Sequence, residues 1–134
     1  KIASLDAVVR ERVHLPGYVA ESDKATLLSG AEALVYPSLY EGFGFPVLEA
    51  QVCGTPVLAA NSSSLPEISA GSALLVDPLD VDEIAEGMRR IVLDGNLRQE
   101  MIANGYNNVR RFDWDKTTVA ALRVLEKAAA DYGR

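Results

Sequence analysis

The sequence is poor in the residues that form covalent cross-links and metal clusters. Among its 134 residues it has one cysteine and one histidine. The single Cys53 excludes an internal disulfide and any zinc cluster built from several cysteines, which fits a reducing compartment. His14 lies in an expected strand, where a structural role is the better interpretation.

Long apolar runs and an excess of basic residues are also missing. No run approaches the roughly 18 apolar residues that a membrane span requires, and no signal peptide is recognisable. The 13 basic residues are outnumbered by 19 acidic ones, and the net charge of −6 argues against a nucleic-acid-binding surface or a strongly basic membrane patch. We therefore expect a cytoplasmic protein with no nucleic-acid partner. A peripheral position at the inner membrane face is compatible with this expectation.

The sequence contains enough hydrophobic residues to form a core. Hydrophobic residues make up 49% of the chain, which suits one compact domain. The first residue is Lys1 and not methionine, so we expect a piece of a longer protein.

Short apolar segments alternate with amphipathic ones. We expect strands at 13–15, 33–36, 56–60 and 73–76. We expect a helix or the remnant of one at 1–11, and helices at 22–30, 46–54, 64–71, 80–95, 97–111 and 115–132. Ser22, Ser64, Asp80 and Asp115 are the expected N-caps, and Gly95 is expected to end the 80–95 helix. Because parallel strands need crossovers, this order predicts an α/β fold, a Rossmann-like doubly wound parallel sheet with helices on both faces. Ligands bind such sheets at the carboxyl ends of the strands.

The stretch from Glu41 to Glu49 follows such a strand end. Gly42 and Gly44 allow the backbone to turn and approach a ligand, and Pro46 suits the first turn of a helix. The free amides and the dipole of a helix start attract anions such as phosphate. The Glu49 carboxylate can accept hydrogen bonds from vicinal hydroxyls. The combination suits a sugar nucleotide, although on spacing alone two solvated acids are an equally good interpretation.

The same residues resemble a known family. The run 36–50, which contains Glu41-x7-Glu49, and Cys53-Gly-Thr-Pro-Val57 resemble the E-x7-E signature of family 4 glycosyltransferases and their GT-B relatives. The resemblance continues through 65–67 and 73–78 to Phe112-Asp-Trp114, and covers roughly residues 12–125.

The resemblance implies a retaining enzyme that transfers a hexose from a nucleoside diphosphate sugar to an acceptor hydroxyl. The donor would be a UDP-, GDP- or ADP-sugar, the acceptor a glycan, lipid or small molecule, and no cofactor or metal is implied. Residues 1–134 would form part of the C-terminal, nucleotide-sugar-binding domain, apparently without its first two strands. The N-terminal acceptor domain, through which any membrane contact would be made, would be absent.

The resemblance also implies roles for individual residues. Glu41 would be the catalytic residue that touches hydroxyls of the donor sugar. Glu49 would hold the ribose, and the loop after the first strand would border the nucleobase. The implied donor-binding residues are Gly42, Phe43, Gly44, Phe45, Glu49, Tyr18 and Val19. The family's Arg and Lys for the diphosphate belong to a segment not in this chain, so we expect the chain alone to be inactive.

Several alternatives compete with this interpretation. Paired carboxyls in a glycosidase lie about 5–9.5 Å apart, and a glycine-rich helix start suits phosphate better than water activation. Asp113-Trp-Asp115 spells a metal-binding D-x-D pattern, but Asp115 is more simply an N-cap. A nicotinamide oxidoreductase would need G-x-G-x-x-G after its first strand, which is missing. A non-catalytic sugar-nucleotide-binding or interaction module stays open, and a related GT-B epimerase is a weaker alternative.

Three structural expectations complete the sequence-based picture. The family's sheet order, 3-2-1-4-5-6, predicts that 13–15 lies apart from the other strands. The last helix should carry an apolar face with little to cover it, with Trp114 wedged between that helix and the sheet. The loop 61–64 is expected to be an ordinary connection.

Overall fold

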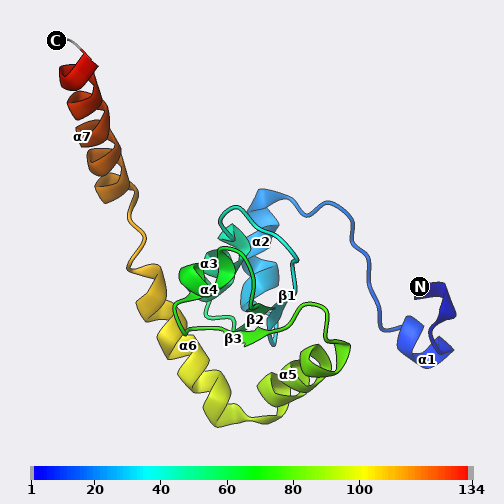
Figure 1. Cartoon of the computed structure of the whole chain (residues 1–134). Helices are drawn as coiled ribbons and strands as arrows, with labels where there is room; N and C mark the ends of the chain where they lie inside the picture. Colours follow the sequence, from blue (N-terminus) through cyan, green and yellow to red (C-terminus); the bar gives the residue numbers. More distant parts are fainter. Residues whose placement is uncertain (1, 133–134) are drawn as a thin grey trace.

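A three-stranded parallel sheet lies at the centre of the computed structural model, which describes residues 2–132 (Figure 1). Its strands are β1 (Leu34–Tyr36), β2 (Val57–Ala60) and β3 (Leu74–Val76), in the order β1-β2-β3. Val35 pairs with Leu58, and Ala59 pairs with Leu75. The predicted Rossmann-like α/β fold and three of its four strands are confirmed.

Helices cover both faces of the sheet, and β2 contributes buried side chains to the core on each face. One face packs against α2 (Glu21–Ser29), α3 (Phe45–Val52) and α4 (Leu65–Ser69). The other packs Leu58 against α5 (Val81–Leu93) and the start of α6 (Gly95–Val109). All four residues of β2 are fully buried, as expected for a central strand with helices on both sides.

A buried polar bridge joins α3 to α6. The Gln51 side chain donates to Ser72 Oγ at 2.7 Å and accepts from Asn108 Nδ2 at 2.8 Å. Asn108 also donates to the carbonyl of Ile68 at 2.9 Å. Buried amides are costly when unpaired, so this bridge fixes how α3 lies against its neighbours.

The two ends of the chain extend away from the sheet (Figure 1). Among the described residues, the N-terminal end forms η1 (Ile2–Ser4) and α1 (Ala7–Arg10), so the segment 2–11 is a remnant of a helix and not one continuous helix. The C-terminal end forms α7 (Trp114–Tyr132), which has no buried residue, so its uncovered apolar face is confirmed. Trp114 is 75% exposed and does not wedge against the sheet, contrary to the prediction.

The expected strand at 13–15 was wrong. Val13 and Leu15 are exposed and belong to an irregular segment of the described chain. A strand exists only where a neighbour pairs with it, and this segment lies apart from β1, as expected.

Aspartates, rather than the residues expected, mark two helix starts. The Asp94 carboxylate accepts from two amides and begins α6, so Gly95 starts a helix instead of ending one. Asp113, not Asp115, accepts the amides of Asp115 and Lys116 at the start of α7. Asp80 caps α5 as predicted. Asp94 and Asp113 cap these helices because each carboxylate reaches the free amides of the residues two and three positions further along the chain.

Ser64 is the N-cap residue of α4 as predicted, but neither Ser64 nor Ser22 makes a side-chain capping bond. Ser22 lies inside α2, whose N-cap is Ala20, and no side chain caps that helix. Ser64 precedes α4, but its hydroxyl bonds to another loop instead of to the helix amides.

Candidate functional site

The loop that joins β1 to α3 is shaped by one glycine. Gly44 has φ of +109° and is the N-cap of α3. A Cβ at this position would lie 2.7 Å from Leu65 Cδ2. Both the backbone conformation and the close side chain therefore require glycine. Gly42 differs, because a Cβ there would meet nothing within 4 Å.

This loop contains a row of free amides, in which Gly44 is buried and Gly42, Phe43 and Phe45 are exposed. Within residues 2–132, the N–H groups of 42–45 have no hydrogen-bond acceptor, whereas the Gly44 carbonyl already accepts from Val47. Pro46, the second residue of α3, has no N–H. Unpaired amides at a helix start can bind phosphate or sugar oxygens, and the helix dipole favours a negative charge there.

Glu41 is held at the base of the loop by a tyrosine. The Tyr36 hydroxyl donates to Glu41 Oε1 at 2.5 Å. Hydrogen bonds from Tyr36 and then Ser38 lower the pKa of Glu41 below its usual value. The same bond from Tyr36, with burial as a smaller cause, raises the pKa of Tyr36 to about 12. Glu41 is therefore an ionised hydrogen-bond acceptor at neutral pH and is unsuited to be an acid catalyst.

The Tyr36–Glu41 bond makes a testable prediction about pH. We expect the Tyr36 phenol to stay protonated past pH 11, measured by NMR titration of its ring carbons, because its pKa lies near 12. Because the folded pKa is raised, the bond's contribution to stability is present below pH 10 and is lost as the pH rises through about 12. In Glu41→Gln the pKa of Tyr36 should fall towards 10.

Glu126→Gln is the matched control, since Glu126 lies on the exposed α7 and has no contact with Tyr36. An unchanged Tyr36 titration in Glu41→Gln would contradict the predicted pairing. At acid pH the dependence of stability on pH has the opposite sign. Because the pKa of Glu41 is lowered in the folded protein, the stabilisation by its ionised carboxylate is lost as the pH falls through that pKa.

Glu49 lies on α3 and pairs with a lysine of α2. Lys24 Nζ lies 3.1 Å from Glu49 Oε1 and 2.9 Å from Glu21 Oε2. Hydrogen bonds to Glu21 and then Glu49 raise the pKa of Lys24. In the described part of the chain, Oε2 of Glu49 has no partner and can accept hydrogen bonds from a ligand.

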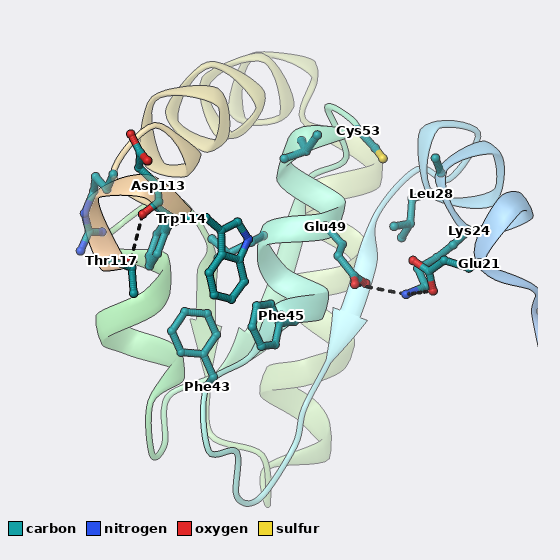
Figure 2. Close-up of a pocket in the computed structure, with 15 residues that line it drawn as sticks. Glu21, Lys24, Leu28, Phe43, Phe45, Glu49, Cys53, Asp113, Trp114 and Thr117 are labelled. Atoms are coloured by element: carbon teal, nitrogen blue, oxygen red, sulfur yellow. Dashed lines mark hydrogen bonds and ion pairs between the residues drawn. The ribbon is translucent and has the colours of Figure 1, made fainter. Parts of the chain in front are cut away.

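Glu49 stands at the rim of a hollow of about 700 Å³ between α2, α3 and the junction of α6 with α7 (Figure 2). Aromatic rings form much of its wall. The rings of Phe43 and Phe45 are 4.6 Å apart, and those of Phe43 and Phe112 are 5.9 Å apart. The other lining residues are Glu21, Lys24, Ala25, Leu28, Leu48, Val52, Cys53, Arg111, Asp113, Trp114 and Thr117.

The structure brings together some of the predicted site residues and separates others. Phe43, Phe45 and Glu49 line the hollow, whereas Glu41 lies outside it beside Tyr36. Tyr18 and Val19 do not line it, and Tyr18 is 93% exposed. The expected nucleobase border is therefore not assembled around this hollow.

Sequence reasoning missed three residues at this hollow. Lys24 carried a partial signal, because a lysine three residues after Glu21 can pair with that acid on the same helix, but the spacing does not reveal its contact with Glu49 on α3. Trp114 was assigned to packing, and Arg111, which lies 5.3 Å from the ring of Phe112, carried no signal at all. Within residues 2–132 no group of three His, Cys, Asp or Glu side chains could hold a metal ion. None of the described helices is long and apolar enough to span a bilayer.

Comparison with known proteins relates this chain to one family of enzymes. The family model described as "Glycosyl transferases group 1" matches residues 3–108. The O-antigen chain mannosyltransferase B of Escherichia coli is 40% identical over 110 residues, which are 82% of this chain and 29% of that protein. The MMP alpha-(1->4)-mannosyltransferase of Mycolicibacterium hassiacum is 35% identical over 129 residues, 91% of this chain and 31% of that protein.

A solved structure shows the same architecture. Sucrose-phosphate synthase from Thermosynechococcus elongatus superposes with a TM-score of 0.81 at 30% identity, covering 90% of this chain and 31% of that one. The chain thus spans less than a third of the length of these relatives.

Proposed function

Because the chain belongs to the group 1 glycosyl transferases, we propose that it is the donor-binding part of a retaining hexosyltransferase. In this proposal a hexose moves from a nucleoside diphosphate sugar to an acceptor hydroxyl with its anomeric configuration kept. The observation that carries the proposal is the row of free amides at 42–45, which starts the helix that holds Glu49.

The diphosphate of the donor would bind at the start of α3. The amides of 42–45 supply hydrogen-bond donors, and the dipole of α3 adds favourable electrostatic energy for an anion. As the sugar leaves, negative charge grows on the phosphate, so donors aimed at it stabilise the transition state more than the ground state. This part of the site would therefore both bind the donor and assist its departure.

Glu49 would hold the ribose of the donor. It lies four residues after Phe45, which places it about 6 Å further along the axis of α3. Its free Oε2 can accept hydrogen bonds from the ribose hydroxyls, while Oε1 stays paired with Lys24. A fixed carboxylate next to a fixed anion site would orient the donor at two points.

Glu41 would contact hydroxyls of the transferred sugar. Its lowered pKa keeps it ionised, so it accepts hydrogen bonds and does not donate a proton to the leaving group. In the proposed front-face mechanism the leaving phosphate itself helps to deprotonate the acceptor hydroxyl. The protein then contributes position and charge stabilisation.

The names of the relatives support mannose as the transferred hexose. Two of the relatives, from different organisms, are named mannosyltransferases. We therefore propose a nucleoside diphosphate mannose as donor, and a glycan, lipid or small-molecule hydroxyl as acceptor.

Calorimetric titration tests the proposal directly. The chain should bind GDP-mannose or a UDP- or ADP-sugar with a saturable heat, and a sugar nucleotide should bind more tightly than NAD. Binding of NAD without binding of any sugar nucleotide would overturn the proposal. Transfer is then measured with the full-length parent protein, and donor binding without transfer there would favour a non-catalytic module.

A further inference from the structure

The loop that follows β2 is bonded to the loop that carries Glu41. Ser62 Oγ lies 3.2 Å from the carbonyl oxygen of Ser38 and 3.4 Å from that of Leu39. Ser63 Oγ accepts from the Glu41 amide at 2.9 Å and lies 3.1 Å from the Glu41 carbonyl oxygen.

The third consecutive serine extends the same contact. Ser64 Oγ lies 2.7 Å from the carbonyl oxygen of Phe43 and 3.0 Å from that of Glu41. One hydroxyl proton serves one acceptor at a time, so these two carbonyls share it. Three consecutive hydroxyls thus reach four residues of a loop more than 20 positions away in sequence.

These bonds use carbonyls and leave amides free. The carbonyls of 38, 39, 41 and 43 face serine hydroxyls, while the amides of 42–45 have no acceptor in the described chain. A peptide unit whose carbonyl is held has its N–H held on the opposite side, because the unit is planar. Anchoring the carbonyls of Glu41 and Phe43 therefore fixes the direction of the N–H groups of Gly42 and Gly44, which belong to the same peptide units.

The backbone of the serine loop is itself in an uncommon conformation. Ser63 has φ of +47°, in the left-handed region that residues with a side chain rarely occupy. This conformation lets one hydroxyl meet both the amide and the carbonyl of Glu41.

We propose that Ser62, Ser63 and Ser64 are positioning residues that hold the 38–45 loop so that its free amides stay aimed at the donor diphosphate. The benefit for binding rests on the proposed function, whereas the fixing of the loop does not. A preorganised loop loses less conformational entropy when a ligand binds, which raises affinity without any added contact.

Ser64→Ala tests the proposal, because it removes the contacts of the hydroxyl with the carbonyls of Glu41 and Phe43. The substitution does not uncap α4, since the Ser64 side chain makes no capping bond to that helix. Ser64→Thr keeps the hydroxyl and should restore the wild-type behaviour. Ser29→Ala is the matched control, since Ser29 also bonds to a backbone carbonyl, that of Thr26, but on α2 away from the loop.

Two readouts are measured on the full chain. Backbone amide order parameters from NMR relaxation follow the mobility of 42–44, and calorimetry follows the Kd for GDP-mannose. In Ser64→Ala we expect lower order parameters in the loop and about three- to tenfold weaker binding, as for one lost hydrogen bond. Ser64→Thr and Ser29→Ala should match the wild type in both.

The two proposals fail in different ways. Lower loop order parameters in Ser64→Ala, with no sugar nucleotide bound even by the wild type, would support the positioning role of the serines and contradict the proposed function. Unchanged order parameters, or wild-type affinity in a protein that does bind the donor, would overturn the positioning role. Equal loss in Ser29→Ala would also overturn it, since the effect would then be general.

Discussion

Glu49→Ala is expected to weaken donor binding by about 10- to 100-fold. A hydrogen bond to a charged group contributes about 1.5–3 kcal/mol, and each 1.4 kcal/mol is about a factor of ten in Kd. Glu49 offers a free Oε2 beside the hollow, so its removal would leave the ribose hydroxyls without an ionised acceptor. Calorimetric titration of the variant with GDP-mannose measures the loss.

The control for this variant comes from the same ion pair. Glu21→Ala also removes a carboxylate from Lys24, at 2.9 Å, but Glu21 lies on α2 and has no proposed role with the ribose. Its Kd should stay within about twofold of the wild type. Both variants should unfold at nearly the wild-type denaturant concentration, because exposed ion pairs contribute little to folding. Similar losses in both variants would mean that Lys24, not Glu49, carries the effect.

Gly44→Ala is expected to damage both the fold around α3 and the binding of the donor. A φ of +109° is strained for alanine, and the new Cβ would press on Leu65 at 2.7 Å. Strain of this kind costs about 1–3 kcal/mol, and relief by moving the loop would displace the amides of 42–45. We expect a loss of stability of that size in chemical denaturation and at least tenfold weaker binding.

Gly42→Ala separates this effect from a general intolerance of alanine in the loop. Gly42 is exposed, and a Cβ there meets nothing within 4 Å. Its unfolding free energy should change by less than about 0.5 kcal/mol, as for other surface substitutions. If Gly44→Ala proves as stable as Gly42→Ala, the packing of Leu65 against the helix start is not what restricts this position.

Local patterns predicted the centre of the fold well. The strand at β1, the proline in the first turn of α3 and Gly54 after its end are determined by neighbours in sequence, and the structure confirms them. The same locality explains the errors at helix starts. Asp94 and Gly95 are adjacent and both favour helix ends, so only the geometry of the first turn decides between them.

The candidate site could be predicted only in part, because many of its contacts join residues that are distant in sequence. The motif located Glu41 and Glu49. It could not show that Tyr36 donates a hydrogen bond to Glu41, or that Lys24 forms an ion pair with Glu49. The serines at 62–64 read as an ordinary connection, because nothing nearby in sequence reveals that they bond to 38–43. The segment at 13–15 failed as a strand for the same reason, since pairing depends on a partner and not on apolar residues alone.

The buried polar bridge between α3 and α6 restricts which substitutions the chain can accept during evolution. Gln51, Ser72 and Asn108 satisfy one another in a buried setting, so replacing any one of them leaves another buried polar group unpaired. A single change is penalised, whereas a joint replacement by apolar residues of similar shape can be nearly neutral. In other members of the family these three positions should therefore change together, as a correlated triplet, even though they are separated by 21 and 57 residues from Gln51.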